Sequence, residues 1–142
     1  MSTKSARAPR RGANRGNISS LLSYRLAIVA NLLTRSQLLR FAAVSDISLS
    51  EWRMLALVGS FGPLSVKSLA RHAALDFGQT SRLVSAMCAG GLIEKARGED
   101  ARSVTLSLTP AGRALRKRLW SVAMRCNQEF LDSLSPAARR GL

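Results

Sequence analysis

The stretch that decides the fold is residues 65–91, SVKSLARHAALDFGQTSRLVSAMCAGG. Ser65 is a preferred N-cap residue and starts a short helix that we expect to end near residue 75. The apolar side chains of this helix recur at helical spacing and form one face: Val66, Leu69, Ala70 and Ala73. Asp76 then opens a second helix, with Gln79 at the capping-box position, and the pair Gly90-Gly91 ends it. Two short helices joined by a tight turn predict a helix-turn-helix.

The second of these helices has two different faces. Its inner face carries Leu83, Val84 and Met87. The opposite face is small, polar and without acids, and it consists of Gly78, Ser81, Arg82 and Ser85, flanked by Gln79. A helix that enters the major groove of DNA needs this profile, because small residues allow close approach while Gln and Arg offer hydrogen-bonding groups to base edges. For this helix alone, the alternative is a solvated surface without a binding role.

After residue 91 the apolar pattern changes from helical spacing to alternation. Residues 92–97 and 103–109 are predicted strands, and the loop 98–102 between them carries charges of both signs. We expect Arg102, oriented by Asp100, to reach a minor groove, where negative potential favours a guanidinium. An exposed ion pair between these two side chains is the alternative interpretation. A helix-turn-helix followed by a hairpin that carries basic residues predicts a winged helix.

Further helices are predicted on both sides of this lobe. Ser48 and Glu51 form a capping box that starts one of them. Thr109, followed by Pro110, starts a long helix. The inner stripe of that helix is Leu115, Leu119, Val122, Cys126, Phe130 and Leu134. Residues 18–41 are apolar on two sides, which favours burial against another subunit; burial within the same domain is the alternative.

The expected fold is therefore mainly α with a small β-hairpin wing (α+β): a winged helix-turn-helix with long terminal dimerisation helices. Four segments are expected. Residues 1–17 form a basic tail that has little to bury and is expected to be disordered. Residues 18–47 form an N-terminal dimerisation helix, and residues 48–109 form the winged helix-turn-helix lobe. Residues 110–142 form a C-terminal dimerisation helix, with a final helix that is expected to be truncated.

The charge of the chain points to a polyanionic partner. Twenty-two Lys and Arg against eight Asp and Glu give a formal net charge of +14, and the part after residue 17 still carries +9. This exceeds what solubility requires, so nucleic acid is the leading candidate. No apolar run approaches the roughly 20 residues that cross a bilayer, and the basic opening segment lacks the apolar stretch of a secretory signal. We therefore expect a cytoplasmic protein without a membrane partner.

Residues for catalysis or metal binding are not grouped in the sequence. Cys88 and Cys126 are far apart, and His72 is the only histidine. The spacing fits neither a zinc cluster nor a nucleophile with its base, and no phosphate-binding glycine loop occurs. Packing is the expected role of both cysteines, and His72 is expected at the surface. We therefore expect no enzyme activity, no cofactor and no metal site.

In several segments the chain resembles the MarR family of bacterial regulators, from about residue 17 to residue 136. The segments are Tyr24-Arg25-Leu26-Ala27, Glu51-Trp52-Arg53-Met54-Leu55, Leu69-Ala70, Thr80-Ser81-Arg82-Leu83-Val84, Gly91-Leu92-Ile93, Asp100-Ala101-Arg102 and Leu108-Thr109-Pro110-Ala111-Gly112. The resemblance implies a homodimer that places two recognition helices in successive major grooves. It also implies a pocket for an aromatic carboxylate or phenolic effector, whose binding releases the DNA.

Candidate site residues follow from the motifs and the resemblance together. Bases or adjoining phosphates would be contacted by Gln79, Ser81, Arg82 and Ser85. The DNA backbone would be held by Ser65, Lys67, Arg71 and Thr80, and the minor groove by Arg102 with Asp100. The effector would be bound by Arg25, Trp52 and Arg53. The two arginines are expected to pair with an anionic ligand, because each sits on a largely apolar helix, where an unpaired guanidinium would be costly. Core packing is the alternative role for Trp52.

The function expected from the sequence is a ligand-responsive repressor that binds a pseudo-palindromic operator as a homodimer. One rival is a basic RNA- or ribosome-associated protein without sequence preference, but RNA readers usually display aromatic side chains for stacking, and only 5% of this chain is aromatic. Another rival is a ligand-sensing module without DNA specificity. That rival predicts acids on the outer face of the second helix of the helix-turn-helix, where the sequence has none.

Overall fold

A computed structural model describes residues 17–97 and 104–141 of the chain. These residues divide into two compact units, one up to Leu33 and one from Thr34 onward. The first unit holds a short 3-10 helix, η1 (Ile18–Ser20), and the greater part of α1 (Leu22–Phe41). The second holds the end of α1, five further helices and two strands. The expectation of a mainly helical fold with one β-hairpin is confirmed.

Every residue from Asn17 to Leu33 is exposed. Nine large apolar or aromatic side chains of this segment have between 37% and 70% of their surface accessible: Ile18, Leu21, Leu22, Tyr24, Leu26, Ile28, Val29, Leu32 and Leu33. The two apolar stripes predicted from the sequence are therefore both uncovered in this unit. Exposed apolar surface of this extent is typical of an interaction site.

The centre of the second unit is α2 (Leu49–Phe61), which contacts α3, α4, β2 and α5. It begins at the predicted capping box: the Glu51 amide donates to Ser48 Oγ at 3.2 Å, and the Ser48 amide donates to Glu51 Oε2 at 2.9 Å. Behind the cap, Met54 and Leu55 are completely buried. This local start and the apolar face explain why α2 forms the core helix.

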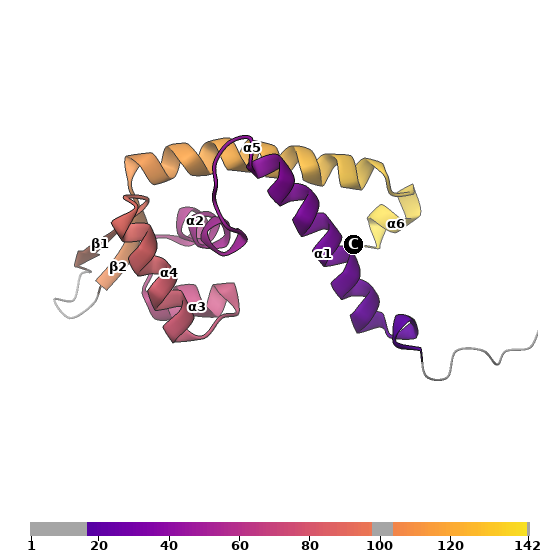
Figure 1. Cartoon of the computed structure of the whole chain (residues 1–142), viewed down its shortest axis with the longest axis horizontal. Helices are drawn as coiled ribbons and strands as arrows, with labels where there is room; N and C mark the ends of the chain where they lie inside the picture. The colour runs from indigo at the N-terminus through magenta and orange to yellow at the C-terminus, as the bar shows by residue number, and fades with distance from the viewer. Residues whose placement is uncertain (1–16, 98–103, 142) are drawn as a thin grey trace, which may run out of the picture. The chain divides into compact units, whose positions relative to one another are not determined.

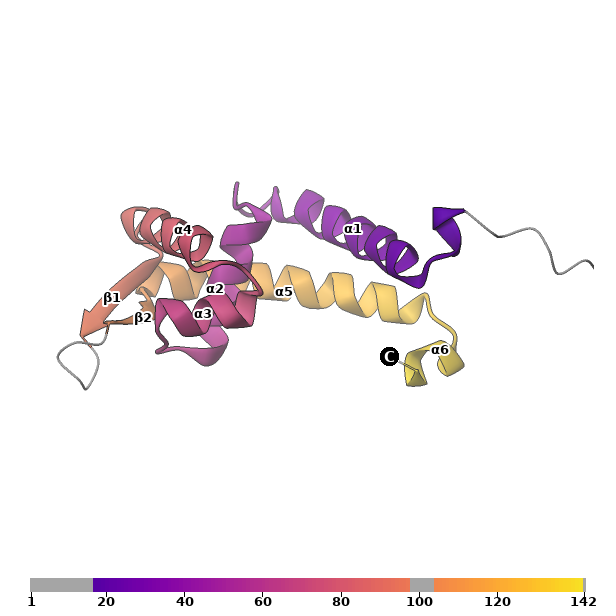
Figure 2. The same cartoon turned by 90° about the horizontal axis from the view of Figure 1, so that it is seen from below.

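Next along the chain come α3 (Val66–Ala73) and α4 (Phe77–Ala89), which contact each other and α2 (Figures 1 and 2). Ser65 caps α3 by accepting from the Ser68 amide at 3.1 Å, and Asp76 caps α4 by accepting from the Gln79 amide at 2.8 Å. Helix α3 ends two residues earlier than expected, because Ala74 adopts a left-handed conformation with φ 53°. The helix-turn-helix is confirmed by this pair.

The strands β1 (Ile93–Arg97) and β2 (Val104–Leu108) form an antiparallel hairpin that pairs Ile93 with Leu108 and Arg97 with Val104. Leu64, just before α3, adds a bridge to Leu106 in β2. Both partners of that bridge are buried. The hairpin is therefore fixed to the helix-turn-helix through the core, as in a winged helix.

Helix α5 (Pro110–Asp132) starts at the predicted cap, where the Gly112 amide donates to Thr109 Oγ1 at 3.0 Å. The hydroxyl of Thr109 also donates to the Gly91 carbonyl at 2.6 Å, which ties the start of α5 to the turn before β1. Leu119 lies in the core, and the predicted inner stripe is buried as far as Val122. A final short helix, α6 (Pro136–Arg140), follows after Ser135.

The end of α1 is joined to α5 by an exposed ion pair in which Arg40 Nη2 lies 2.6 Å from Glu129 Oε2. The hydrogen bond from Arg40 lowers the pKa of Glu129 below its ordinary value, and the same bond raises the pKa of Arg40. This pair and one between Arg139 and Asp132 are the only ion pairs formed among residues 17–97 and 104–141.

Candidate nucleic-acid interface

The outer face of α4 is polar and accessible, as predicted. Gln79, Arg82 and Ser85 are exposed, and Gly78 and Ser81 are half-buried. On the opposite side, Val84 and Met87 are at most 1% exposed and pack in the core. A shallow hollow of about 500 Å³ runs along α4, with Gln79 and Arg82 in its lining. The arrangement presents paired hydrogen-bonding groups on a helix whose other side is fixed.

The guanidinium of Arg82 lies near the first turn of α4. If Gly78 carried a Cβ, that atom would be 3.5 Å from Arg82 Nη1 and 3.2 Å from Asp76 Oδ1. The missing side chain at Gly78 therefore leaves room for the guanidinium beside the capping carboxylate. The face itself carries no acid, but Asp76 at its edge lies near Arg82. The Asp76 carboxylate reduces the positive electrostatic potential at the start of the helix.

Helix α3 presents a second group of predicted contacts. Lys67 and Arg71 are exposed on α3, opposite the buried side chain of Leu69. Ser65 is exposed too; its oxygen accepts the Ser68 amide, and its O–H proton remains available to a further acceptor. Within the described ranges, the cations of α3 and α4 form no ion pair. Such cations are suited to contact phosphate oxygens.

Thr80 is not part of this surface, and its predicted backbone contact is wrong. Its side chain is 0% exposed, and its hydroxyl donates to the Asp76 carbonyl at 2.9 Å. The reason is its position in the helix: Thr80 precedes Val84 by four residues and Met87 by seven, which places it on the inner stripe. Its role is therefore structural, because it packs inside the lobe and bonds to the first turn of α4.

Phe77 is a surface residue that sequence reasoning missed. It is the first residue of α4, and 59% of its side chain is exposed. An apolar ring next to the exposed Gln79 is unusual on a polar face. The available signal was its position directly after the Asp76 cap, where a helix in the major groove brings its first residues to the bases.

The predicted minor-groove contact falls on the hairpin tip. Asp100 and Arg102 lie outside the described residues, so this prediction stays a prediction. The strand that leads to the tip ends at Arg97, which is exposed together with Lys95. The described part of the hairpin thus carries two exposed cations beside one exposed acid, Glu94.

Two of the three predicted effector residues line one cavity. Trp52 and Arg53, both on α2, border a hollow of about 450 Å³ together with His72 of α3. Trp52 is 7% exposed and contacts two other aromatic rings, with centroid distances of 5.1 Å to Phe41 and 6.2 Å to Trp120. Trp52 therefore packs in the core and also lines the cavity.

The prediction that Arg25 and Arg53 are costly unpaired charges on apolar helices is wrong. Arg53 and Arg25 are both exposed, so neither guanidinium is buried on an apolar helix. Arg53 remains a candidate because it borders the cavity, whereas Arg25 belongs to the unit that ends at Leu33. Exposure keeps a guanidinium hydrated and available to an anion.

The only histidine and the two cysteines of the chain show no sign of a catalytic or metal-binding role among the described residues. His72 is exposed and stacks on Phe61 with a ring-centroid distance of 4.4 Å. Cys88 and Cys126 are half-buried thiols. Among the described residues, no group of three or more metal-binding side chains occurs, and no helix has the length and hydropathy needed to cross a membrane.

Comparisons with known proteins agree on one family. A model of the MarR family matches residues 45–103, which cover α2 to β1 and the segment leading into β2. A MarR family transcriptional regulator from Silicibacter pomeroyi DSS-3 has a similar structure, with a TM-score of 0.76 and 29% sequence identity over 87% of this chain and 89% of that chain. No match was found among curated protein sequences.

Two further structures show the same fold with a bound partner. FabT from Streptococcus pneumoniae, solved in complex with DNA, has a TM-score of 0.71 and 22% identity over 86% of this chain and 87% of that chain. A MarR family protein from Mycobacterium tuberculosis, solved with p-aminosalicylic acid, has a TM-score of 0.67 and 25% identity over 85% and 92%. The capped helix-turn-helix, the hairpin fixed to it and these comparisons together show that the chain has a winged-helix fold similar to that of MarR family transcriptional regulators.

Proposed function

We propose that the chain is a DNA-binding transcriptional repressor of the bacterial cytoplasm, without enzyme activity. The observation that carries this proposal is the outer face of α4, where Gln79, Arg82 and Ser85 are exposed on a helix that the core holds in place. Sequence-specific readout needs such a rigid helix with donors and acceptors at its surface. A similar fold in a protein solved with DNA supports the proposal.

Each exposed group has a proposed role on the duplex. Gln79, Ser81, Arg82 and Ser85 read base edges or adjoining phosphates, and Ser65, Lys67 and Arg71 hold the backbone. Arg102, oriented by Asp100, enters the minor groove next to the hairpin. Phe77 adds an apolar contact of the kind that the methyl group of thymine accepts.

The proposed assembly is a homodimer formed through the terminal helices, in segments 18–47 and 110–142. The support is the exposed apolar surface of residues 18–33, which a second copy would cover. Two copies of the lobe 48–109 would then face consecutive major grooves. The operator would be pseudo-palindromic, with half-sites about one helical turn, or roughly 10 bp, apart.

The proposed effector is a small aromatic carboxylate or phenol. The cavity bordered by Trp52, Arg53 and His72 supports it, because an aromatic wall and a guanidinium are the groups that such a ligand requires. Arg25 is the third proposed contact. The relative solved with p-aminosalicylic acid supports the same ligand class. Binding would release DNA by favouring a subunit spacing that no longer fits the operator.

The deciding experiment selects binding sites from random duplexes and then measures affinity for the selected site, for random DNA and for structured RNA. Arg82→Ala is expected to weaken binding to the selected site by about 1–3 kcal/mol and to change random DNA less. Arg118→Ala is the matched control. Arg118 is exposed on α5, so this substitution removes the same charge at a position away from α4. Equal losses on both DNAs, or tighter binding to RNA, would contradict the proposal.

Assembly and effector binding are tested separately. Sedimentation of the full chain at several concentrations is expected to show a dimer. Arg53→Ala is expected to weaken the binding of p-aminosalicylic acid in calorimetry, and Arg25→Ala tests the third contact in the same way. Unchanged affinity in a variant removes that residue from the proposed site.

A further inference from the structure

The aromatic ring of Phe77 lies at the N-terminal end of α4. Phe77 is the first residue of that helix, and 59% of its surface is exposed. Helical side chains tilt toward the N-terminus of their helix, so this ring extends past the beginning of α4. Ser81 follows four residues later and lies on the same side of the helix. The ring therefore borders the outer face of α4, at the end of a recognition helix whose residues contact base edges.

The backbone that carries this ring is fixed on both sides. Before the ring, Ala74 turns the chain with φ 53°, and the Leu75 amide donates to the Ala70 carbonyl at 3.1 Å. After it, the Asp76 carbonyl accepts from the Thr80 amide at 3.1 Å and from the Thr80 hydroxyl at 2.9 Å. An anchored backbone leaves only the two side-chain dihedrals of a phenylalanine to be ordered, so a contact made by the ring costs little entropy.

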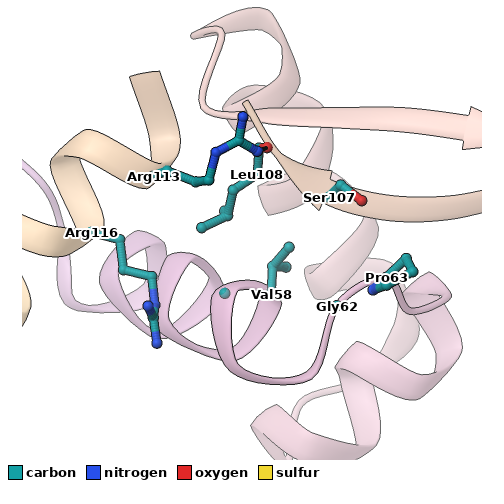
Figure 3. A pocket seen from close by; sticks show the side chains of 8 residues that line it. Val58, Gly62, Pro63, Ser107, Leu108, Arg113 and Arg116 are labelled. Atoms are coloured by element: carbon teal, nitrogen blue, oxygen red, sulfur yellow. Dashed lines mark hydrogen bonds between the residues drawn. The ribbon is translucent and has the colours of Figure 1, made fainter. Parts of the chain in front are cut away.

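The other exposed aromatic side chains of the second unit already have partners within the protein. Phe61 stacks on His72 with a ring-centroid distance of 4.4 Å. The ring centroid of Trp120 lies 5.0 Å from the guanidinium of Arg116, a side chain that extends over α2 (Figure 3). Among residues 34–97 and 104–141, Phe77 has neither an aromatic nor a cationic partner of this kind. Its ring is therefore available to a group outside the chain.

The surroundings of the ring indicate which part of a duplex it contacts. A phosphate gains nothing from an apolar ring, and the exposed carboxylate of Asp76, one residue earlier, repels it. Gly78, the next residue, has no side chain that would hold a base edge away. In the major groove, the apolar group on a base edge is the 5-methyl group of thymine. 5-Methylcytosine carries the same group at the same position, whereas cytosine and uracil carry hydrogen there.

We propose that Phe77 makes DNA binding by this chain dependent on a pyrimidine 5-methyl group. Thymine or 5-methylcytosine is preferred over uracil or cytosine at one position of each half-site. This inference rests on the proposed DNA-binding function and adds a form of regulation to it. Methylation of a cytosine at that position places a methyl group against the ring and strengthens binding, although the base pairing does not change.

The test uses the full chain and the duplex selected from random DNA. Each thymine is replaced in turn by uracil, which keeps every hydrogen-bonding group of the base and removes only the methyl group. Fluorescence anisotropy is expected to show one position in each half-site at which uracil weakens binding about three- to fivefold, the effect of one buried methyl group. A selected site without thymine, or one in which no uracil weakens binding, overturns the proposal.

The second arm separates the two sources of the methyl group. A cytosine–guanine pair is placed at the position found with uracil, with and without a 5-methyl group on the cytosine. The methylated duplex is expected to bind about three- to fivefold more tightly than the unmethylated one. Equal binding of these two duplexes leaves thymine as the only source and overturns the role of methylation.

Variants of α4 assign the preference to the ring. Phe77→Ala is expected to bind the thymine and uracil duplexes equally, at about the affinity of the parent chain for the uracil duplex. Phe77→Leu keeps an apolar side chain and is expected to retain most of the preference. Gln79→Ala is the matched control, because Gln79 is exposed on the same turn and its loss is expected to weaken both duplexes by the same factor. An undiminished preference in Phe77→Ala overturns the proposal.

These measurements also separate the inference from the proposed function. If the selected duplex binds no more tightly than random DNA, the proposed function is wrong, and the inference is wrong with it. If the selected duplex binds specifically but the thymine and uracil duplexes bind equally, the function stands and only the role of Phe77 is wrong.

Discussion

Gly112→Ala tests how closely α5 packs against the turn that precedes β1. An ideal Cβ at Gly112 would lie 2.0 Å from the Leu92 carbonyl oxygen and 3.0 Å from its carbon, and both are backbone atoms that cannot rotate away. The same carbonyl accepts from the Thr109 amide at 3.1 Å, and the Thr109 hydroxyl donates to Gly91 at 2.6 Å. The first turn of α5 therefore has to move, and both hydrogen bonds are strained when it does.

The magnitude follows from three contributions. Overpacking costs about 1–3 kcal/mol. Two weakened hydrogen bonds add about 1 kcal/mol each at most. The better helix propensity of alanine returns up to about 1 kcal/mol. We expect a net loss of about 2–4 kcal/mol, which at an m-value of about 2 kcal/mol/M lowers the urea midpoint by about 1–2 M.

The assay is urea unfolding at one fixed protein concentration, because a dimer makes stability depend on concentration. Gly90→Ala is the matched control: Gly90 has φ −77°, and a Cβ there meets nothing closer than 3.5 Å. We expect this control to stay within about 0.5 kcal/mol of the parent chain. If Gly112→Ala unfolds at the same urea concentration as Gly90→Ala, the close approach of α5 to Leu92 is refuted.

Three further predictions concern single side chains. Leu106→Ala removes a completely buried side chain from β2 and is expected to cost about 2–5 kcal/mol in urea unfolding; a smaller loss would contradict its central place in the core. Thr80→Val keeps the shape of a buried residue and is expected to leave operator affinity unchanged in fluorescence anisotropy. A clear loss of operator affinity would mean that Thr80 does contact DNA. Because Arg40 lowers the pKa of Glu129, the stabilisation from this pair is present above the ordinary glutamate pKa of about 4.3 and is lost as the pH falls through the lower folded value. Glu129→Gln is therefore expected to be less stable than the parent chain at pH 7 and to approach its stability in acid, once the Glu129 carboxylate of the parent chain is protonated; NMR titration should place the pKa of Glu129 in the parent chain below its pKa in the Arg40→Gln variant.

Local signals were sufficient for the helix starts. Ser48, Ser65, Asp76 and Thr109 all cap as predicted, because each cap is a bond to an amide only three residues away. The end of α3 was placed too late because Ala74 adopts the left-handed conformation without the glycine or asparagine that usually marks it. Such an end is imposed by tertiary packing, which a window of sequence does not contain.

The outer face of α4 was predicted nearly in full. The stripe of apolar residues marks the inner side of the helix, and the opposite side follows from helical geometry. The prediction that Thr80 contacts the DNA backbone did not follow from helical spacing. The spacing pointed the other way, because Thr80 repeats with Val84 at four residues and with Met87 at seven. A helical threonine that bonds to the carbonyl four residues earlier has its polar group satisfied and can be buried.

The cavities show where reasoning from sequence stops. Gly59 and Arg116 are 57 positions apart in the sequence, and nothing near either of them indicates that the arginine lies on the glycine. The contact exists because β2 and the first turns of α5 return the chain to α2, and Leu64, just after α2, bridges Leu106 in β2. A guanidinium on a predicted helix is expected to point into water, so its charge was counted toward nucleic acid. The structure instead places the side chain of Arg116 over Gly59, with the guanidinium 5.0 Å from the ring centroid of Trp120, and this position cannot be inferred from the net charge of +14.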